Sequence, residues 1–148
     1  MPEKPKILIV DDDEYHLILL KRLFQNAGIE VSCATNGGDA LLEMSINSFS
    51  CMITDFNMPR MNGIELATKA KKVAPSMPIV LCTGEDLNNI GWLLSVEVIE
   101  AVITKPVNYS DILAMVIEKI RHPNRAESEE IPENRTVEPT DVCQWLSI

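Results

Sequence analysis

Several side chains that suit phosphoryl transfer stand at or just past the ends of short apolar runs in this sequence. An amine and a hydroxyl can each hold an anionic phosphoryl oxygen, and a carboxylate can attack phosphorus as a nucleophile. Three carboxylates brought together would repel one another unless a divalent cation lay among them, and hard Mg²⁺ prefers carboxylate and phosphate oxygens. The pattern therefore predicts Mg²⁺-dependent chemistry on an Asp, carried by Asp11, Asp12, Asp55, Thr83 and Lys105.

The apolar runs before these residues are typical of buried parallel strands. They are short and contain β-branched residues, which suits a sheet that is covered on both faces. The carboxyl ends of parallel strands meet at one edge of a sheet, where ligands bind. We therefore expect one shared pocket at the ends of strands over residues 7–10, 51–54, 79–82 and 102–104.

Asp55 is the candidate nucleophile, because it directly follows a predicted strand. Taken alone, it could equally cap the turn after that strand, and Asp11 and Asp12 could belong to a solvated loop. Both acidic groups follow buried strands, however, and this coincidence favours a metal site. Thr83 and Lys105 are weak signals separately, but together with Mg²⁺ they supply the positioning and charge neutralisation that phosphoryl transfer needs.

Helix-like segments alternate with the predicted strands five times between residue 6 and about residue 121. This alternation is typical of an α/β fold with a parallel sheet. A further strand is expected over residues 31–34. The first expected helix begins near Asp13 or Glu14 and ends before Gly28, and the second runs through Ala40 and Met44. The third and fourth span residues 64 to about 73 and 86 to about 96, and the fifth follows a cap at Ser110.

A chain of 148 residues with 46% hydrophobic content can bury one sizeable core. We expect a short N-terminal tail over residues 1–5, one domain over residues 6–122, and an acidic tail over residues 123–148. The tail is polar and lacks a sustained period, so it is expected to be disordered. Its last apolar residues could either dock on the domain or a partner, or fray.

The formal net charge of −9, with Lys and Arg spread along the chain, disfavours direct nucleic-acid binding. No segment approaches the roughly 18 to 20 apolar residues of a membrane span. The first residues also lack the apolar stretch of a signal peptide. The sequence therefore predicts a cytoplasmic protein with no membrane contact.

Cysteine and histidine residues show no spacing typical of a metal site. The cysteines within apolar runs are expected to be reduced core residues, and the one in the tail could be an exposed thiol. The two histidines are expected on a helix surface and at a helix end, where neither is a good phosphohistidine candidate. These residues are Cys33, Cys51, Cys82, Cys143, His16 and His122.

With these motifs the chain resembles the receiver domain of two-component response regulators, from residue 6 to about residue 121. Asp55 opens a D-x-x-M-P-x-M-x-G stretch that matches the family's phosphoacceptor motif, and Lys105-Pro106 matches its Lys-Pro pair. The resemblance implies a flavodoxin-like (βα)5 fold with strand order 2-1-3-4-5 and a cis peptide bond before Pro106. It also implies that Mg²⁺ is held by Asp12, Asp55 and the backbone carbonyl of Asn57, with Asp11 acting mainly through water.

The resemblance further implies a phosphorylation-controlled signalling switch. A histidine kinase or a histidine phosphotransfer protein would supply the phosphoryl group. A downstream effector would bind the face formed by the fourth helix, fifth strand and fifth helix. Such a protein catalyses only its own phosphorylation and dephosphorylation, so it is not expected to be an enzyme acting on other substrates.

Two departures from the family bear on the switch. Val102 stands where these domains commonly carry a Tyr or Phe that turns inward on phosphorylation, and Val98-Ile99 replace the usual Gly-Ala pair. A shift of Thr83 would therefore act through smaller side chains or loop motion. Trp92 is either an exposed anchor of the output face or part of the helix core.

Two other classes of protein fit less well. A haloacid dehalogenase-like phosphatase needs a second Asp two residues after its nucleophile, where this chain has Asn57, and a substrate-capping insertion for which there is no room. A phosphate-independent pseudoreceiver scaffold usually lacks the acceptor, the acidic pair or the Lys, and none is lost here.

Overall fold

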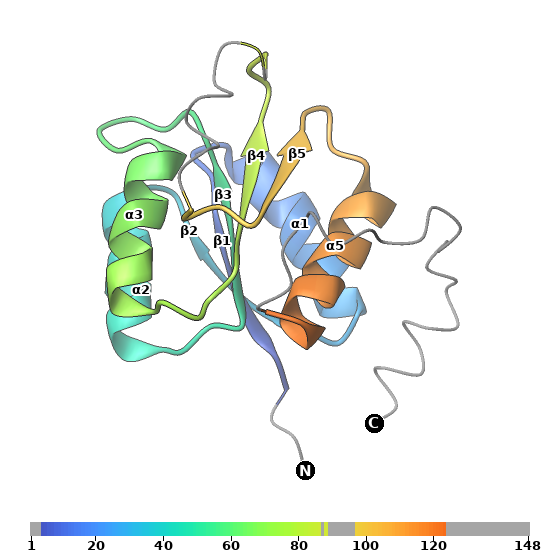
Figure 1. Ribbon diagram of the computed structural model, residues 1–148. Helices are drawn as coiled ribbons and strands as arrows, with labels where there is room; N and C mark the ends of the chain where they lie inside the picture. Colours follow the sequence, from blue (N-terminus) through green and yellow to red (C-terminus); the bar gives the residue numbers. More distant parts are fainter. Residues whose placement is uncertain (1–3, 87, 89–96, 124–148) are drawn as a thin grey trace.

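The computed structural model describes residues 4–86, 88 and 97–123. Its centre is a parallel sheet of five strands in the order β2-β1-β3-β4-β5 (Figure 1). This arrangement confirms the predicted flavodoxin-like α/β fold and its strand order. The strands are β1 (Lys6–Val10), β2 (Glu30–Ala34), β3 (Cys51–Asp55), β4 (Ile79–Thr83) and β5 (Ala101–Thr104).

Helices cover both faces of the sheet. Figure 1 shows α2 and α3 on one side and α1 and α5 on the other. The alternation of side chains along each strand divides the core accordingly: Ile7 and Ile9 face the α1 and α5 layer, whereas Leu8 and Val10 face the α2 and α3 layer. The helices are α1 (Glu14–Asn26), α2 (Gly37–Ile46), α3 (Gly63–Val73) and α5 (Tyr109–Arg121).

The boundaries of α1 follow the signals in the sequence. The Asp13 side chain accepts hydrogen bonds from the backbone N–H groups of Tyr15 and His16, which caps the amino end of the helix. Gly28 has a φ of 80°, a left-handed conformation that costs glycine little, and it stands just past the end of the helix. Both predicted boundaries of this helix are confirmed.

The predicted cap of α5 was wrong. Asn108, rather than Ser110, precedes the helix, and its side chain accepts the backbone N–H of Asp111 at 3.1 Å. Asn108 has the extended backbone that a capping residue requires, with φ −82° and ψ 113°, whereas Ser110 already lies within the helix. Both residue types cap helices well, so local composition alone could not choose between them.

The strand β5 is less buried than its sequence predicts. It lies at one edge of the sheet beside β4, and there Val102 is half-buried and Thr104 is exposed. The neighbouring pair Val98 and Ile99 packs against the α2 and α3 core. Of the predicted helix from residue 86 to about 96, the structure describes only Asp86 and Asn88, so Trp92 lies outside the described residues. The tail from residue 124, which contains Cys143, also lies outside them.

Cys51 and Cys82 are buried in the core, as predicted, and burial raises the pKa of each thiol to about 12. Cys33 is only half-buried on β2, next to the same core.

None of the helices in the described part of the chain is long and apolar enough to cross a membrane. The domain limits at residues 6 and 122 stay predictions.

Candidate functional site

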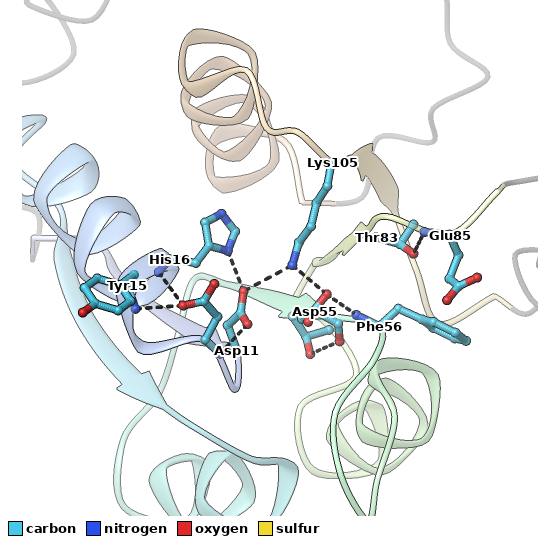
Figure 2. Close-up of polar contacts among 10 residues, drawn as sticks. Asp11, Tyr15, His16, Asp55, Phe56, Thr83, Glu85 and Lys105 are labelled. Atoms are coloured by element: carbon cyan, nitrogen blue, oxygen red, sulfur yellow. Dashed lines mark hydrogen bonds and ion pairs between the residues drawn. The ribbon is translucent and has the colours of Figure 1, made fainter.

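The structure brings the predicted site residues together at the carboxyl edge of the sheet. Asp11 follows β1, Asp55 ends β3, Thr83 ends β4 and Lys105 follows β5, so four different strands supply them (Figure 2). Asp11, Asp55 and Thr83 are buried, with 2%, 7% and 1% of their surface exposed. The convergence follows from the parallel order of the strands, which ends each of them at the same edge.

Lys105 joins the two buried carboxylates. Its Nζ lies 3.1 Å from Asp55 Oδ1 and 3.6 Å from Asp11 Oδ2. Asp55 Oδ1 also accepts the backbone N–H of Phe56 at 3.0 Å. The peptide bond between Lys105 and Pro106 is cis, as the resemblance implies.

Gly63 allows the Asp55 loop to return closely to the sheet. A Cβ atom at this position would lie 2.3 Å from the backbone oxygen of Asp55 and 2.8 Å from Leu81 Cδ1. Instead, the Gly63 N–H donates to the carbonyl of Phe56 at 2.9 Å. The glycine of the D-x-x-M-P-x-M-x-G motif is therefore required by the close packing of α3 against β3 and β4.

The two methionines of the same motif anchor the loop to the core. Met58 and Met61 pack against the α2 and α3 core, and Met61 lies so close to Gly37 that a Cβ there would meet its sulfur at 2.6 Å. Arg60 makes the tight turn between them, with a φ of 72° and a hydrogen bond of 2.9 Å from the Met61 N–H to the Pro59 carbonyl. The loop that carries Asn57 is thus fixed at both ends.

His16 is part of the site, although the sequence predicted it on the helix surface. Its Nδ1 atom lies 2.5 Å from Asp11 Oδ2, and its side chain is only 13% exposed (Figure 2). Side chains of a helix lean toward its amino end, so a residue in the first turn of α1 can reach back to the residue that follows β1. In the sequence, only the spacing of five residues between Asp11 and His16 indicates that the two side chains could meet.

The two buried carboxylates have opposite pKa shifts. Burial, and then the negative charge of Asp11, raise the pKa of Asp55, and Lys105 offsets this only in part. Burial also acts to raise the pKa of Asp11, but the bonds from His16 and Asp13 and the charge of Lys105 outweigh it, so that pKa is lowered. Burial acts to lower the pKa of Lys105, and the two carboxylates outweigh it and raise that pKa.

The acidic cluster fits a divalent cation. Asp11, Asp12 and Asp55 each offer a carboxylate oxygen, and these oxygens lie within 4.8 Å of one another. The Asp12 side chain is exposed and makes no hydrogen bond or ion pair with the described residues. The cluster therefore combines one uncommitted carboxylate with an Asp55 whose ionised form is disfavoured, and hard cations stabilise such a group of oxygens.

Thr83 and Glu85 extend the site along the end of β4. Thr83 Oγ1 accepts the backbone N–H of Glu85 at 2.9 Å, which leaves the hydroxyl hydrogen free to be donated elsewhere. The Asn57 side-chain amide donates to Glu85 Oε1 at 2.8 Å. Two exposed residues from different loops, Asn57 and Glu85, thus form a polar bridge beside the pocket.

Opposite stability changes are expected when each buried carboxylate is neutralised in metal-free buffer at neutral pH. A raised folded-state pKa means that ionising Asp55 costs stability, so Asp55→Asn is expected to raise the free energy of unfolding by roughly 1 kcal/mol. A lowered folded-state pKa means that ionised Asp11 stabilises the fold, so Asp11→Asn is expected to lower that free energy by about 3 kcal/mol.

Urea unfolding in EDTA at several pH values measures both changes. The gain from Asp55→Asn is expected to appear as pH rises through the raised pKa of Asp55. The loss from Asp11→Asn is expected to shrink as pH falls through the lowered pKa of Asp11, because the side chain at position 11 is then neutral in the parent as well as in the variant. Changes of the same sign in the two variants would contradict the assigned pKa directions.

Comparisons with known proteins agree with this geometry. A model of the response regulator receiver domain matches residues 7–117. Among solved structures, a CheY-like response regulator receiver domain protein from Methanospirillum hungatei superposes with a TM-score of 0.78 at 32% identity. That match covers 82% of this chain and 97% of the other.

Curated relatives include both sensor proteins and transcriptional regulators. The sensor protein EvgS of Escherichia coli is 43% identical over 79 residues, which make up 53% of this chain and 7% of EvgS. The transcriptional regulatory protein CpxR homolog of Haemophilus influenzae is 32% identical over 114 residues, or 75% of this chain and 48% of the relative. The chain thus spans less than half the length of either relative.

Proposed function

The chain belongs to the response regulator receiver family of two-component systems, and we propose that its Asp55 accepts a phosphoryl group from a phosphohistidine. A histidine kinase or a histidine phosphotransfer protein would carry that phosphohistidine. One observation carries the proposal: Asp55 ends β3 within 3.1 Å of the Lys105 amine and inside a cluster of three carboxylates.

The free oxygen of Asp55 is the nucleophile in this proposal. Oδ1 is engaged by Lys105 and by the Phe56 N–H, whereas Oδ2 makes no hydrogen bond or ion pair with any described residue. Oδ2 attacks phosphorus, the bond from phosphorus to the histidine nitrogen breaks, and the electron pair of that bond leaves with the nitrogen. The product is an acyl phosphate on Asp55.

Lys105 and Thr83 would hold the transferred group. Lys105 already lies beside Asp55, so its amine is within reach of a phosphoryl oxygen there. The Thr83 hydroxyl hydrogen is free to be donated to a second phosphoryl oxygen. Asp12, Asp55 and the Asn57 carbonyl would hold Mg²⁺, with Asp11 acting through water, and the ion would neutralise negative charge on the phosphoryl oxygens.

The surface beside the pocket supports a protein donor. Helix α1 begins next to Asp12 and exposes the apolar side chains of Tyr15, Ile18 and Leu19, which are 82%, 49% and 49% exposed. A partner that delivers a phosphoryl group must approach this edge of the sheet, and apolar surface next to the pocket offers it contact area.

The output of the switch is proposed from the family alone. A downstream effector would read the face of the fourth helix, β5 and α5 after Thr83 moves toward the phosphoryl group. Val102, half-buried on β5, replaces the common aromatic residue, so that motion would be transmitted through smaller side chains or through loop motion. The proposed location is the cytoplasm, without membrane or nucleic-acid contact. The proposed catalysis is limited to self-phosphorylation and autodephosphorylation.

Incubation with acetyl phosphate and Mg²⁺ tests this function directly. The intact mass is expected to rise by one phosphoryl group, about 80 Da, and to return to its starting value with time. A protein that takes up no phosphoryl group from acetyl phosphate or from any histidine donor would instead be a phosphate-independent scaffold.

The phosphorylated state is expected to be comparatively short-lived. Asn57 and Glu85 form an exposed polar bridge beside Asp55, and such groups leave the acyl phosphate accessible and can orient an attacking water. Asn57→Met and Glu85→Leu are each expected to slow the decay by about tenfold.

Decay of the phosphorylated protein in Mg²⁺ buffer, followed by intact mass, measures this effect. Glu30→Leu is the matched control, because Glu30 is an exposed acid at the opposite end of the strands. Its decay is expected to equal that of the parent. If Asn57→Met and Glu85→Leu both lose phosphate as fast as the parent, these side chains do not control the access of water to the acyl phosphate.

A further inference from the structure

His16 makes a contact that the phosphoacceptor motif does not account for. The imidazole reaches from the first turn of α1 to Asp11, with 2.5 Å between Nδ1 and Oδ2. The side chains of His16 and Asp11 are only 13% and 3% exposed. A short bond of this kind, shielded from water, is one of the stronger hydrogen bonds that a protein can make.

This bond makes the two adjacent acids unequal. Asp11 Oδ1 accepts the Asp13 N–H at 2.9 Å, and Oδ2 contacts both His16 and Lys105. Of the roughly four lone pairs of a carboxylate, donors from the chain itself therefore occupy most. The Asp12 carboxylate has no such partner among the described residues.

We propose that His16 is a positioning residue that holds the Asp11 carboxylate in the metal-free pocket and thereby weakens the site for a divalent cation. The proposal rests on the proposed function in that it takes the acidic cluster to be the Mg²⁺ site. The affinity of a site is the free-energy difference between its filled and empty forms. A hydrogen bond that stabilises the empty form more than the filled form therefore lowers the affinity.

The direction of this effect follows from what His16 donates. Its Nδ1–H stabilises the negative charge of Asp11, whether the ring is neutral or charged, so less of that charge is available to a cation. Lys105 acts in the same sense, but it is also needed for the phosphoryl group. His16 can therefore adjust cation affinity without taking part in phosphoryl transfer, and phosphorylation comes to depend on the concentration of free Mg²⁺.

Two substitutions of similar shape separate the hydrogen bond from packing. His16→Asn keeps a donor, because its Nδ2 stands as many bonds from Cα as the imidazole Nδ1. His16→Leu has the same branching without a donor. Both are compared with the parent by titrating Mg²⁺ at constant pH and ionic strength and following the amide NMR shifts of residues near the pocket.

The Leu variant is expected to bind Mg²⁺ about fivefold to tenfold more tightly than the Asn variant, with the parent close to the Asn variant. The same pair of substitutions in an Asp11→Asn background is expected to give equal affinities, because the carboxylate that His16 holds is then gone. If Asp11 is intact and the Leu and Asn variants bind Mg²⁺ equally well, or if the Leu variant binds more weakly, the proposal is overturned.

The measurement is independent of phosphorylation. Tighter binding by His16→Leu in a protein that acetyl phosphate does not phosphorylate would support the role of His16 and contradict the proposed function. No saturable Mg²⁺ binding by the parent or by either variant would overturn both, because no cation site would exist to be weakened.

Discussion

An Asp55→Asn protein is expected to gain no phosphoryl group from acetyl phosphate and Mg²⁺ under conditions in which the parent gains one. Asp55 ends β3 within the acidic cluster, and its Oδ1 lies 3.1 Å from the Lys105 amine. Asp11 lies in the same cluster, but its two oxygens are bonded to the Asp13 N–H and to His16. An amide in its place keeps the shape and removes the nucleophilic oxygen. Intact-mass measurement is expected to show the gain of about 80 Da in the parent only.

Asp13→Asn is the matched control for this loss. Asp13 neighbours the acidic pair, and the substitution makes the same charge change. Its side chain accepts hydrogen bonds from the amino end of α1, however, and Asn caps a helix as well as Asp does. This variant is expected to be phosphorylated like the parent. An Asp55→Asn protein that still gains the phosphoryl mass on another residue would overturn the assignment of Asp55.

The sequence predicted the strands and the convergence of the site for one physical reason. Short apolar runs fix which segments are buried, and the parallel order then brings every strand end to the same edge. Asp55 therefore had to lie at the same edge of the sheet as Asp11 once both runs were parallel strands. The order of the strands itself came from the resemblance to receiver domains, because periodicity does not determine which strands are neighbours.

The features that the sequence did not predict depend on contacts between side chains. His16 and Ser110 were placed by their local context, as a surface residue and a helix cap. The structure puts His16 against Asp11 and gives the cap to Asn108. Asn108 and Ser110 were similar candidates for the cap, and His16 had only its helical context to place it. In both cases the distances set by the folded backbone decided the contact.

The exposed β5 edge and the bridge from Asn57 to Glu85 were missed for a related reason. A strand at the edge of a sheet has the same apolar sequence as a central strand when it is short, so its burial cannot be read from composition. Asn57 and Glu85 each stand two residues past a strand-end site residue, so the sequence could place both beside the pocket. The hydrogen bond between them depends on side-chain distances that only the folded backbone sets.

Neutralising Asp12 is expected to weaken Mg²⁺ binding far more than neutralising Asp11. Asp12 is exposed and has no partner among the described residues, so its carboxylate can bind a cation directly at no cost in broken contacts. The Asp11 carboxylate is already bonded to the Asp13 N–H and to His16. We expect a loss of affinity of at least about 100-fold for Asp12→Asn and of about tenfold for Asp11→Asn.

Titration of Mg²⁺ followed by amide NMR shifts measures the affinities of both variants and the parent. Asp13→Asn controls for the loss of one negative charge close to the pocket, and its affinity is expected to fall by no more than about twofold, since screening weakens the effect of an exposed charge. Comparable losses in Asp12→Asn and Asp13→Asn would mean that the general negative potential holds the ion. If Asp12→Asn binds Mg²⁺ as tightly as the parent, Asp12 is not part of the site. A cation held by this cluster must bind more weakly once the one uncommitted carboxylate is removed.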